Sequence, residues 1–461
     1  MASKVYYMDG RSFSPQTSMV SKMVTVFEAA GFDNLIKRGD VVAIKVHCGE
    51  WDNTAYLRPV YARTLADRIK TLGGRPFVCD TTTLPYSPTS SRGTALDLMV
   101  TAERNGNTSA ALGCPFICAD GFMGVDDYRV DLPEGYILNE AYIAEAIAAA
   151  DVLITLTHFK GHGIGVFGGA IKNLGIGAQS KRGKFNVHMG GHPKYGLAAS
   201  AIFHPENCKG RSGEKDWQVL EAVCPFDLFH VTENSIEWER EKCCDCICCL
   251  GPMSSRSIFE FANDNFKATN AAIADACLAT TKAVGKDKVA YINLAIDLAA
   301  RCDCAGFSDT PMLPNLGVFA GFDPVAVDKA CLDTARDTAG IPGTIADDME
   351  VLAPGEHKFD ACSPMLAGLR EDIQINCGEI IGLGTRNYDL VQVDEQPMEK
   401  FIFPPDPRPA GIRMREKFAK IPVFPYDRYD GKGFSRKDEV DLEYLNAYYD
   451  NGEKLTMPKQ K

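Results

Sequence analysis

Five cysteines stand within seven residues in the stretch CCDCICC, which begins at Cys243. Cys243, Cys246 and Cys249 have the C-x2-C-x2-C spacing that holds three corners of an iron–sulfur cluster in bacterial ferredoxins. In those runs a fourth cysteine follows after three residues and precedes a proline. Met253 occupies that position, so the run alone lacks one of the four sulfur ligands that such a cluster needs.

A Cys-Pro pair upstream, Cys224-Pro225, supplies the missing ligand. In two-cluster ferredoxins the Cys-Pro cysteine of one run binds the cluster held by the other run. A second set would need three cysteines near Cys208 and one at position 253, but Arg211 and Met253 stand there instead. The sequence therefore predicts one cluster kept and one lost as a unit. The predicted ligands of the single 4Fe–4S cluster are Cys224, Cys243, Cys246 and Cys249.

Two cysteines of the run, Cys244 and Cys248, are surplus, and they either neighbour the ligands or compete with them. Zinc also accepts four cysteines, so a zinc site is an alternative, as are thiols that bind nothing. The chain has 17 cysteines. Clustered cysteines in a large chain without a secretory leader favour metal or redox chemistry over disulfides.

A second dense stretch, Thr157–Gly196, directly follows an apolar segment of strand length. Its glycines let a backbone approach a ligand and present N–H groups to anions. Histidines serve as metal ligands or as acids and bases near neutral pH. The stretch contains His158, His162, His188 and His192, with Lys160, Lys172, Lys181, Lys184 and Lys194.

A C-D-C motif, Cys302 to Cys304, follows the apolar segment Lys288–Leu298. This pair could bind a metal or merely cap the end of a strand. The polar stretches Lys45–Glu50 and Cys79–Pro85 end two further apolar segments. Because sites in parallel sheets gather at the carboxyl ends of strands, all of these stretches could converge on one cleft.

Alternating strand-like and helix-like segments must position these residues. Short apolar runs alternate with segments of helical periodicity, which predicts an α/β fold with a mostly parallel sheet flanked by helices. The predicted strands of the first half are Val41–His47, Pro76–Asp80, Pro115–Asp120 and Asp151–Phe159, and the predicted helices are Arg58–Gly74 and Asn139–Ala150.

The alternation resumes after the cysteine-rich segment, which therefore reads as an insertion into one α/β core. The tail is rich in proline, charge and tyrosine and has too little apolar periodicity for a core of its own. The predicted parts are residues 1–204 and 257–395 for the core, 205–256 for a ferredoxin-like insertion, and 396–461 for an arm that wraps the domain or a neighbouring subunit.

The composition narrows the class of protein. A net charge of −12 argues against a nucleic-acid binder, which would need basic patches for phosphates. The N-terminus has no apolar secretory segment, and no apolar run approaches the 18 residues of a membrane span. We therefore expect a cytoplasmic protein.

Three stretches resemble a known family: VAIKVHCGEWDNTAYLRPV, HFKGHGIGVFGGAIKNLGIG and CDCAGFSDTPMLPNLGVFAGFDPVAVDKA. With the cysteine-rich insertion they resemble the uncharacterised iron–sulfur centre proteins, domain of unknown function 362, over roughly residues 1–390. Members commonly carry a two-cluster ferredoxin insertion, whereas this chain keeps ligands for one cluster. The resemblance implies cluster binding and no established reaction.

A shorter segment is similar to the nickel-pincer lactate racemase family. His162, Lys172 and His188 stand in the order of that family's catalytic histidine, cofactor-bearing lysine and nickel-binding histidine. Asp80 matches an aspartate of an Asp-x-Thr turn that contacts substrate or cofactor there. Thr83 stands where that family has an arginine.

The hypothesis we favour is an oxidoreductase in which the cluster passes electrons to a small anionic substrate or second cofactor, with His162 or His188 as the acid. Its electron donor would be ferredoxin-like or a flavoprotein. The alternatives are a racemase-like or other non-redox enzyme using a metal or a lysine-bound cofactor, and a plain electron carrier or metallocentre partner. The predicted catalytic residues are His162, Lys172, His188 and His158, and the predicted cofactor-binding residues are Lys45, His47, Asp80, Gly168, Gly169 and Asn173.

Overall fold

The computed structural model describes residues 2–397 and residue 437, except for residues 85–90, 209–215, 234, 247, 250–257, 261–262 and 364–368. The chain divides into two compact units, Met1–Gln396 and Pro397–Lys461. The arm predicted over residues 396–461 lies almost wholly outside the described residues, as do Arg211 and Met253.

An eight-stranded sheet, in the order β16-β1-β15-β14-β7-β2-β3-β4, forms the centre of the first unit. Every neighbouring pair is parallel except the two that β15 makes with β1 and β14. The predicted α/β class and mostly parallel sheet are confirmed. The strands are β1 (Ser3–Asp9), β2 (Val41–Lys45), β3 (Arg75–Asp80), β4 (Phe116–Cys118), β7 (Val152–His158), β14 (Val289–Ala295), β15 (Gly317–Gly321) and β16 (Tyr388–Gln392).

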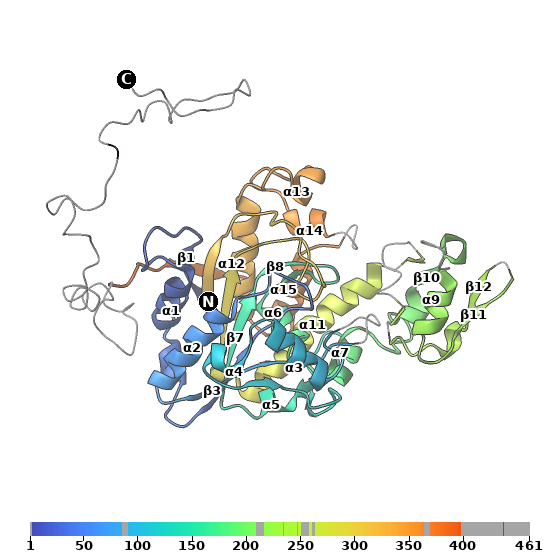
Figure 1. Cartoon of the computed structure of the whole chain (residues 1–461), viewed down its shortest axis with the longest axis horizontal. Coiled ribbons are helices and arrows are strands. Elements are labelled where there is room, and N and C mark those ends of the chain that lie inside the picture. The colour runs from blue at the N-terminus through green and yellow to red at the C-terminus, as the bar shows by residue number, and fades with distance from the viewer. Residues whose placement is uncertain are drawn as a thin grey trace, which may run out of the picture. The chain divides into compact units, whose positions relative to one another are not determined.

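Both faces of this sheet are covered by helices, which explains why its strands read as continuous apolar runs. Side chains alternate between two cores: Val42 and Ile44 of β2 join one, and Ala43 joins the other. Figure 1 shows the helices around the sheet. The first core holds α1 (Met19–Ala29), α2 (Pro59–Thr71) and α3 (Ala95–Arg104), and the second holds α6 (Ala170–Gly175), α11 (Asn263–Val284) and α12 (Pro324–Asp337).

Smaller elements complete the described core. These smaller elements are the helices α4 (Ser109–Leu112), α7 (Lys181–Val187), α8 (Leu197–Ser200), α13 (Ile345–Asp348), α14 (Lys358–Cys362) and α15 (Asp372–Ile380), the strands β8 (Lys160–His162) and β9 (Val166–Gly168), and the 3-10 turns η1 (Phe32–Leu35) and η4 (Lys286–Lys288).

None of the described helices is long and apolar enough to cross a bilayer.

The helix predicted over Asn139–Ala150 is wrong in its first half. Residues Glu140–Ala144 form strand β6, which pairs antiparallel with β5 (Asp127–Asp131), and only α5 (Glu145–Ala148) is helical. Ala141 and Ile143 are buried while Tyr142 between them is partly exposed. This alternation is the period of a strand with one buried face, and it outweighed the helical propensity of the alanines.

A cysteine-rich insertion is present between the two parts of the core. Strand β10 (Ile202–Phe203) at its entry pairs with β13 (Phe259–Glu260) at its exit, and the chain then continues into α11 (Figure 1). Phe203, Phe229, Trp238 and Phe259 pack in mutual ring contacts. The likeness of this insertion to a ferredoxin stays a prediction. Its other elements are η2 (Pro205–Asn207), α9 (Asp216–Val223), β11 (Phe229–Val231), β12 (Ile236–Trp238) and η3 (Arg240–Lys242).

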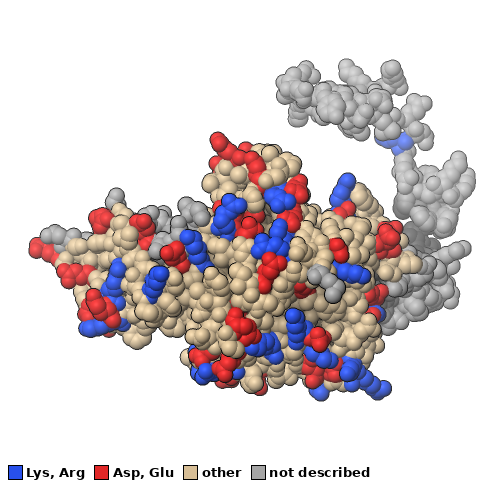
Figure 2. Space-filling view, turned by 180° about the vertical axis from the view of Figure 1, so that it is seen from behind, with Lys and Arg blue, Asp and Glu red and all other residues tan. Residues whose placement is uncertain are grey.

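Charged side chains of both signs are interspersed over the face that Figure 2 shows, without a continuous basic surface. This distribution agrees with the net charge of −12.

A buried carboxylate fixes the start of α6, the helix that carries Lys172 and Asn173. Asp328 accepts hydrogen bonds from the backbone N–H of Ala170 (2.7 Å) and Ile171 (2.9 Å) and from the side chain of Asn293 (2.7 Å). Burial raises the pKa of Asp328 to about 6, against these hydrogen bonds. A Cβ on Gly169 would lie 2.3 Å from the Asp328 carboxylate, so this close approach requires glycine.

We expect Asp328→Ala to lower the free energy of unfolding by about 3 kcal/mol or more, because three buried donors lose their acceptor. Asp337→Ala is the matched control on the same helix, since its side chain is 64% exposed. The control should change stability by less than about 0.5 kcal/mol. Urea unfolding measures both, and equal losses in the two variants would contradict the role given to Asp328.

Candidate active site and metal centre

A cavity of about 270 Å³ lies at the carboxyl ends of β2, β3 and β7 and beside the loop that follows β14. Parallel sheets place ligand sites at this edge. The structure brings together every residue predicted for catalysis or cofactor binding. The cavity is lined by Lys45, His47, Asp80, His158, His162, Gly168, Gly169, Lys172, Asn173 and His188.

Lys45 and Asp80 form a buried ion pair in the cavity floor, with 3.0 Å between Nζ and Oδ1. Lys45 also donates to Asn173 Oδ1 at 3.1 Å. Burial opposes ionisation of Asp80, but the charges of Lys45, His47 and Arg92 outweigh it and lower the pKa of this carboxyl. The pair therefore neutralises itself, and Lys45 positions Asp80 and Asn173 instead of offering a free charge.

Asp303, the central residue of the C-D-C motif, holds two further predicted residues. His158 Nδ1 lies 3.0 Å from each Asp303 oxygen, and Lys160 Nζ lies 2.9 Å from Oδ2. Burial opposes ionisation of Asp303, but His158 and Lys160 lower its pKa. His158 Nε2 faces the carbonyl oxygen of Ile296 at 2.7 Å. Since both ring nitrogens lie within hydrogen-bond distance of oxygen atoms, His158 is held at both ends of the ring and suits a positioning role.

His162 is held in one tautomer by the turn between β8 and β9. Its Nδ1 accepts the backbone N–H of Ile164 (3.1 Å) and Gly165 (2.8 Å). Burial, and then the charges of Lys172 and Lys160, lower the pKa of His162, so the ring is neutral. The remaining proton is therefore on Nε2, which lies 3.6 Å from Cys304 Sγ.

Lys172 and Lys184 carry the titratable amines of the cavity. Removal from water, and then the charges of Lys160 and Lys45, lower the pKa of Lys172 to about 7. Burial lowers the pKa of Lys184 to about 8, and this amine donates to Thr81 Oγ1 at 2.7 Å. Burial and the same kind of cationic neighbours lower the pKa of His188 to about 3. Near neutral pH, Lys172 is thus a group that can both give and take a proton.

Two arginines that line the cavity, Arg92 and Arg301, were not among the site residues predicted from the sequence. Arg92 pairs with Glu50 (3.1 Å), and its carbonyl oxygen accepts the N–H of Thr83 at 2.9 Å. Arg92 and Thr83 both line the cavity. No local motif signals Arg92, because its contact with Thr83 depends on tertiary structure.

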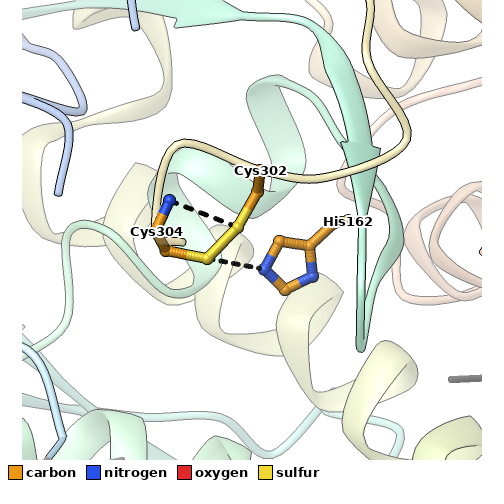
Figure 3. A group of neighbouring side chains, drawn as sticks. All are labelled: His162, Cys302 and Cys304. Carbon is orange, nitrogen blue, oxygen red and sulfur yellow. Dashed lines mark hydrogen bonds between the residues drawn. A yellow bond between two sulfur atoms is a disulfide. The ribbon is translucent and has the colours of Figure 1, made fainter. Parts of the chain in front are cut away.

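Cys302 and Cys304 lie in the cavity wall and are joined by a disulfide (Figure 3). The sequence left metal binding and strand capping open for this pair, and the structure shows a third state. With His162 the two sulfurs form a group of donor atoms within 4.8 Å of one another. A thiolate and not a disulfide sulfur is the usual metal ligand, so the paired state does not favour an ion.

The cysteines of the run line a second, smaller cavity, which lies in the insertion. It is lined by Cys224 together with the described cysteines of the run, whereas Cys208 is not among the lining residues. Burial raises the pKa of Cys243 to about 12, so a metal would have to displace thiol protons. A thiol-rich, otherwise apolar lining is the donor set that iron–sulfur clusters use. The lining cysteines are Cys224, Cys243, Cys244, Cys246, Cys248 and Cys249.

One carboxylate ties the cysteine run to the core. Asp245, between Cys244 and Cys246, is buried and accepts the backbone N–H of Gly191 (2.8 Å) and Ala198 (2.6 Å). Gly191 follows the cavity residue His188 by three positions. The segment after His188 is therefore the direct support of the cysteine run.

A family model described as Domain of unknown function (DUF362) matches residues 42–333. The chain belongs to this family. The matched range covers every residue that lines the core cavity and the whole cysteine-rich insertion.

This DUF362 chain has a distant structural resemblance to the lactate racemase apoprotein from Thermoanaerobacterium thermosaccharolyticum, with 11% sequence identity and a TM-score of 0.37. The alignment covers 87% of this chain and 85% of that chain. No curated protein matches the chain.

We expect Cys224→Ala to lose iron and sulfide as completely as Cys246→Ala, because both residues line the same cavity. Cys208→Ala is the matched control, since Cys208 lies in the insertion but outside that lining. Iron and sulfide are measured per chain after purification without oxygen. Loss of iron in Cys208→Ala, or its retention in Cys224→Ala, would contradict the ligand set.

Proposed function

We propose that the chain is an iron–sulfur oxidoreductase that reduces a small anionic organic molecule in the core cavity. The observation that carries the proposal is the pair of hydrogen bonds that the Asp245 side chain accepts from the backbone N–H groups of Gly191 and Ala198, here called the Asp245 clasp. It joins the cysteine run to the segment that leaves the cavity at His188. An enzyme that moves electrons needs its electron source beside its substrate, and a structural cluster does not.

The proposed cluster ligands are Cys224, Cys243, Cys246 and Cys249. When bound, a 4Fe–4S cluster supplies single electrons at a potential set by hydrogen bonds, charge and solvent exposure. The Asp245 carboxylate within the run contributes negative charge, while its hydrogen bonds to Gly191 and Ala198 fix the loop. A ferredoxin-like protein or a flavoprotein is the proposed external electron donor.

An anionic substrate follows from the charge that remains in the cavity. Lys45 is paired with Asp80, Lys160 with Asp303 and Arg92 with Glu50. Among the described residues, Lys172, Lys184 and Arg301 line the cavity without an ion-pair partner. A carboxylate or phosphate group would supply the missing negative charge in a site with little water.

The proton that accompanies the electrons is assigned to Lys172. The sequence favoured His162 or His188 as the acid. His162 has its Nδ1 occupied by two backbone donors, and His188 is neutral at pH 7 because its pKa is about 3. An acid works best when its pKa lies near the working pH, and the pKa of Lys172 is about 7.

The lowered pKa of Lys172 also favours a second candidate, a non-redox isomerase. At pH 7 about half of such an amine is neutral and can attack a carbonyl group or carry a covalent cofactor. In this candidate the cluster is structural. The two candidates require opposite protonation states of Lys172, so pH separates them.

We expect dithionite-reduced protein to be reoxidised by small carboxylates or phosphates that carry a reducible C=O or C=C bond, with two reduced clusters consumed per molecule, because each cluster gives one electron and the bond takes two. Lys172→Ala should slow this step roughly 10²-fold at unchanged iron content, because it removes the proton donor. In the parent chain the rate should fall as pH rises through about 7, since the donor is the protonated amine. Stopped-flow absorbance of the cluster measures the rate.

Lys329→Ala is the control for that variant, because Lys329 lies on α12 and pairs with Asp333 outside the cavity. It should leave the rate within twofold of the parent, roughly the effect of a surface ion pair. An unchanged rate in Lys172→Ala would remove Lys172 from the mechanism. Failure of every acceptor class would contradict the oxidoreductase.

The isomerase candidate predicts a covalent adduct instead. Small 2-oxo acids with borohydride should then modify Lys172, in a yield that rises with pH through about 7 as the amine becomes neutral. Peptide mass spectrometry locates the adduct. Modification spread over surface lysines, with none on Lys172, would contradict this candidate.

A further inference from the structure

The disulfide in the cavity wall has no part in the proposed function. Cys302 and Cys304 both line the cavity, and His162 Nε2 lies 3.6 Å from Cys304 Sγ (Figure 3). We propose that this pair is a redox-active dithiol–disulfide couple that exchanges two electrons with an anionic thiol entering the cavity. The couple goes beyond the proposed function and does not depend on a cluster.

The loop is held at its central residue, so the two sulfurs keep their places when the bond opens. The Asp303 side chain is fixed by His158 at 3.0 Å and by Lys160 at 2.9 Å. Its carbonyl oxygen accepts the N–H of Glu50 at 2.8 Å. Contacts from three different segments thus fix the residue between the sulfurs, and such preorganisation favours reversible closure of the disulfide.

Each sulfur has its own hydrogen-bond donor for the thiolate that forms on reduction. His162 Nε2–H points at Cys304 Sγ, because Nδ1 is occupied by the backbone donors of Ile164 and Gly165. The N–H of Cys304 lies 3.3 Å from Cys302 Sγ. A stabilised thiolate is a better leaving group, so both donors accelerate opening of the bond.

An anionic thiol is favoured over a neutral one by the cations around the disulfide. Lys172, Lys184 and Arg301 line the same cavity as the two sulfurs, and among the described residues none of the three has an ion-pair partner. The attacking species in thiol–disulfide exchange is itself a thiolate. A second negative group on the same molecule, such as a carboxylate, would bind the cations that the disulfide leaves unpaired.

The reaction balances with two thiols as the reductant. A first thiolate attacks Cys302 Sγ, the S–S bond breaks, and Cys304 leaves as a thiolate hydrogen-bonded to His162. A second thiolate attacks the reductant's sulfur in the mixed disulfide, which releases Cys302 and the oxidised reductant. Two electrons pass to the protein, and the two protons of the reductant thiols end on Cys302 and Cys304 through solvent.

The test measures reduction of the pair by thioglycolate, 2-mercaptoethanol and cysteamine, which are anionic, neutral and cationic. The full chain, oxidised anaerobically with oxidised dithiothreitol, is quenched with iodoacetamide, and the peptide containing Cys302 and Cys304 is quantified by mass spectrometry. Per thiolate, we expect thioglycolate to react at least roughly tenfold faster than cysteamine, and salt to reduce the difference. Equal rates for the three thiols would overturn the entry of an anionic thiol.

Variants of His162 test the leaving-group contact. His162→Asn keeps an acceptor near the position of Nδ1 and removes the Nε2 donor, so reduction should slow roughly tenfold. His162→Gln places an N–H donor near the position of Nε2 and should restore much of the rate. His357→Gln is the control, because its ring pairs with Glu371 outside the cavity. Equal rates in His162→Asn and the parent chain would overturn the role of His162.

The outcome does not depend on the iron–sulfur proposal. Cys224→Ala should retain the couple even where it loses iron, so the two proposals can fail separately. A redox titration of the parent chain with mixtures of reduced and oxidised dithiothreitol needs no variant. The ratio of reduced to oxidised Cys302–Cys304 pair should change tenfold for about every 30 mV of change in the solution potential, as expected of a two-electron couple. Cysteines that stay fully alkylated in all buffers, or one zinc per chain released when they are modified, would overturn the couple.

Discussion

Excess positive charge in a poorly hydrated cavity is the constraint on which the site depends. Burying a charge without a partner is costly, and the chain offsets this cost with three buried carboxylates, of which Glu50 compensates Arg92. Asp80 compensates Lys45, and Asp303 compensates Lys160 while it holds His158. The charge that remains is reduced in another way, because Lys172 has a pKa of about 7 and His188 stays neutral. The cavity is thus prepared for an anion and for proton transfer by the same electrostatics.

The central sheet holds the side chains of this cavity in fixed positions. Its central strands are buried on both faces, so their carboxyl ends are rigid points from which Lys45, Asp80 and His158 project. Helix α6 brings Lys172 to the same place, and Asp328 beneath it satisfies the first backbone donors of the helix. The Asp245 clasp then links this assembly to the cysteine run through the segment after His188. Metal chemistry in the insertion and ligand chemistry in the core would therefore share one support.

The position of the cavity could be predicted because its residues follow strands that are readable as apolar runs. His47, Asp80 and His158 each stand at the end of such a run, and topology alone brings these ends together. The roles of individual groups could not be read in this way. His158 is tied at both nitrogens, and His162 has only one nitrogen free of backbone donors, which depends on distances that no spacing encodes.

Two further features of the structure could not be predicted from the sequence. Arg92 lines the cavity and its carbonyl oxygen contacts Thr83, a tertiary contact that no motif encodes. Strand β6 was assigned to a helix because its alanines favour helices, whereas its pairing with β5 decides the outcome. The grouping of Cys224 with the later cysteines in one cavity could be expected from the sequence, because in ferredoxins a Cys-Pro cysteine binds a cluster held by another part of the chain.

The central claim is that the cysteine run holds one iron–sulfur cluster, and elemental analysis tests it most directly. Iron, acid-labile sulfide, nickel and zinc are measured per chain in protein purified without oxygen. About four iron and four sulfide, the content of one 4Fe–4S cluster, is the predicted result. Nickel beside them would shift the account toward a metal-dependent isomerase. Zinc without sulfide would contradict the claim, since the cysteines would then form a structural zinc site.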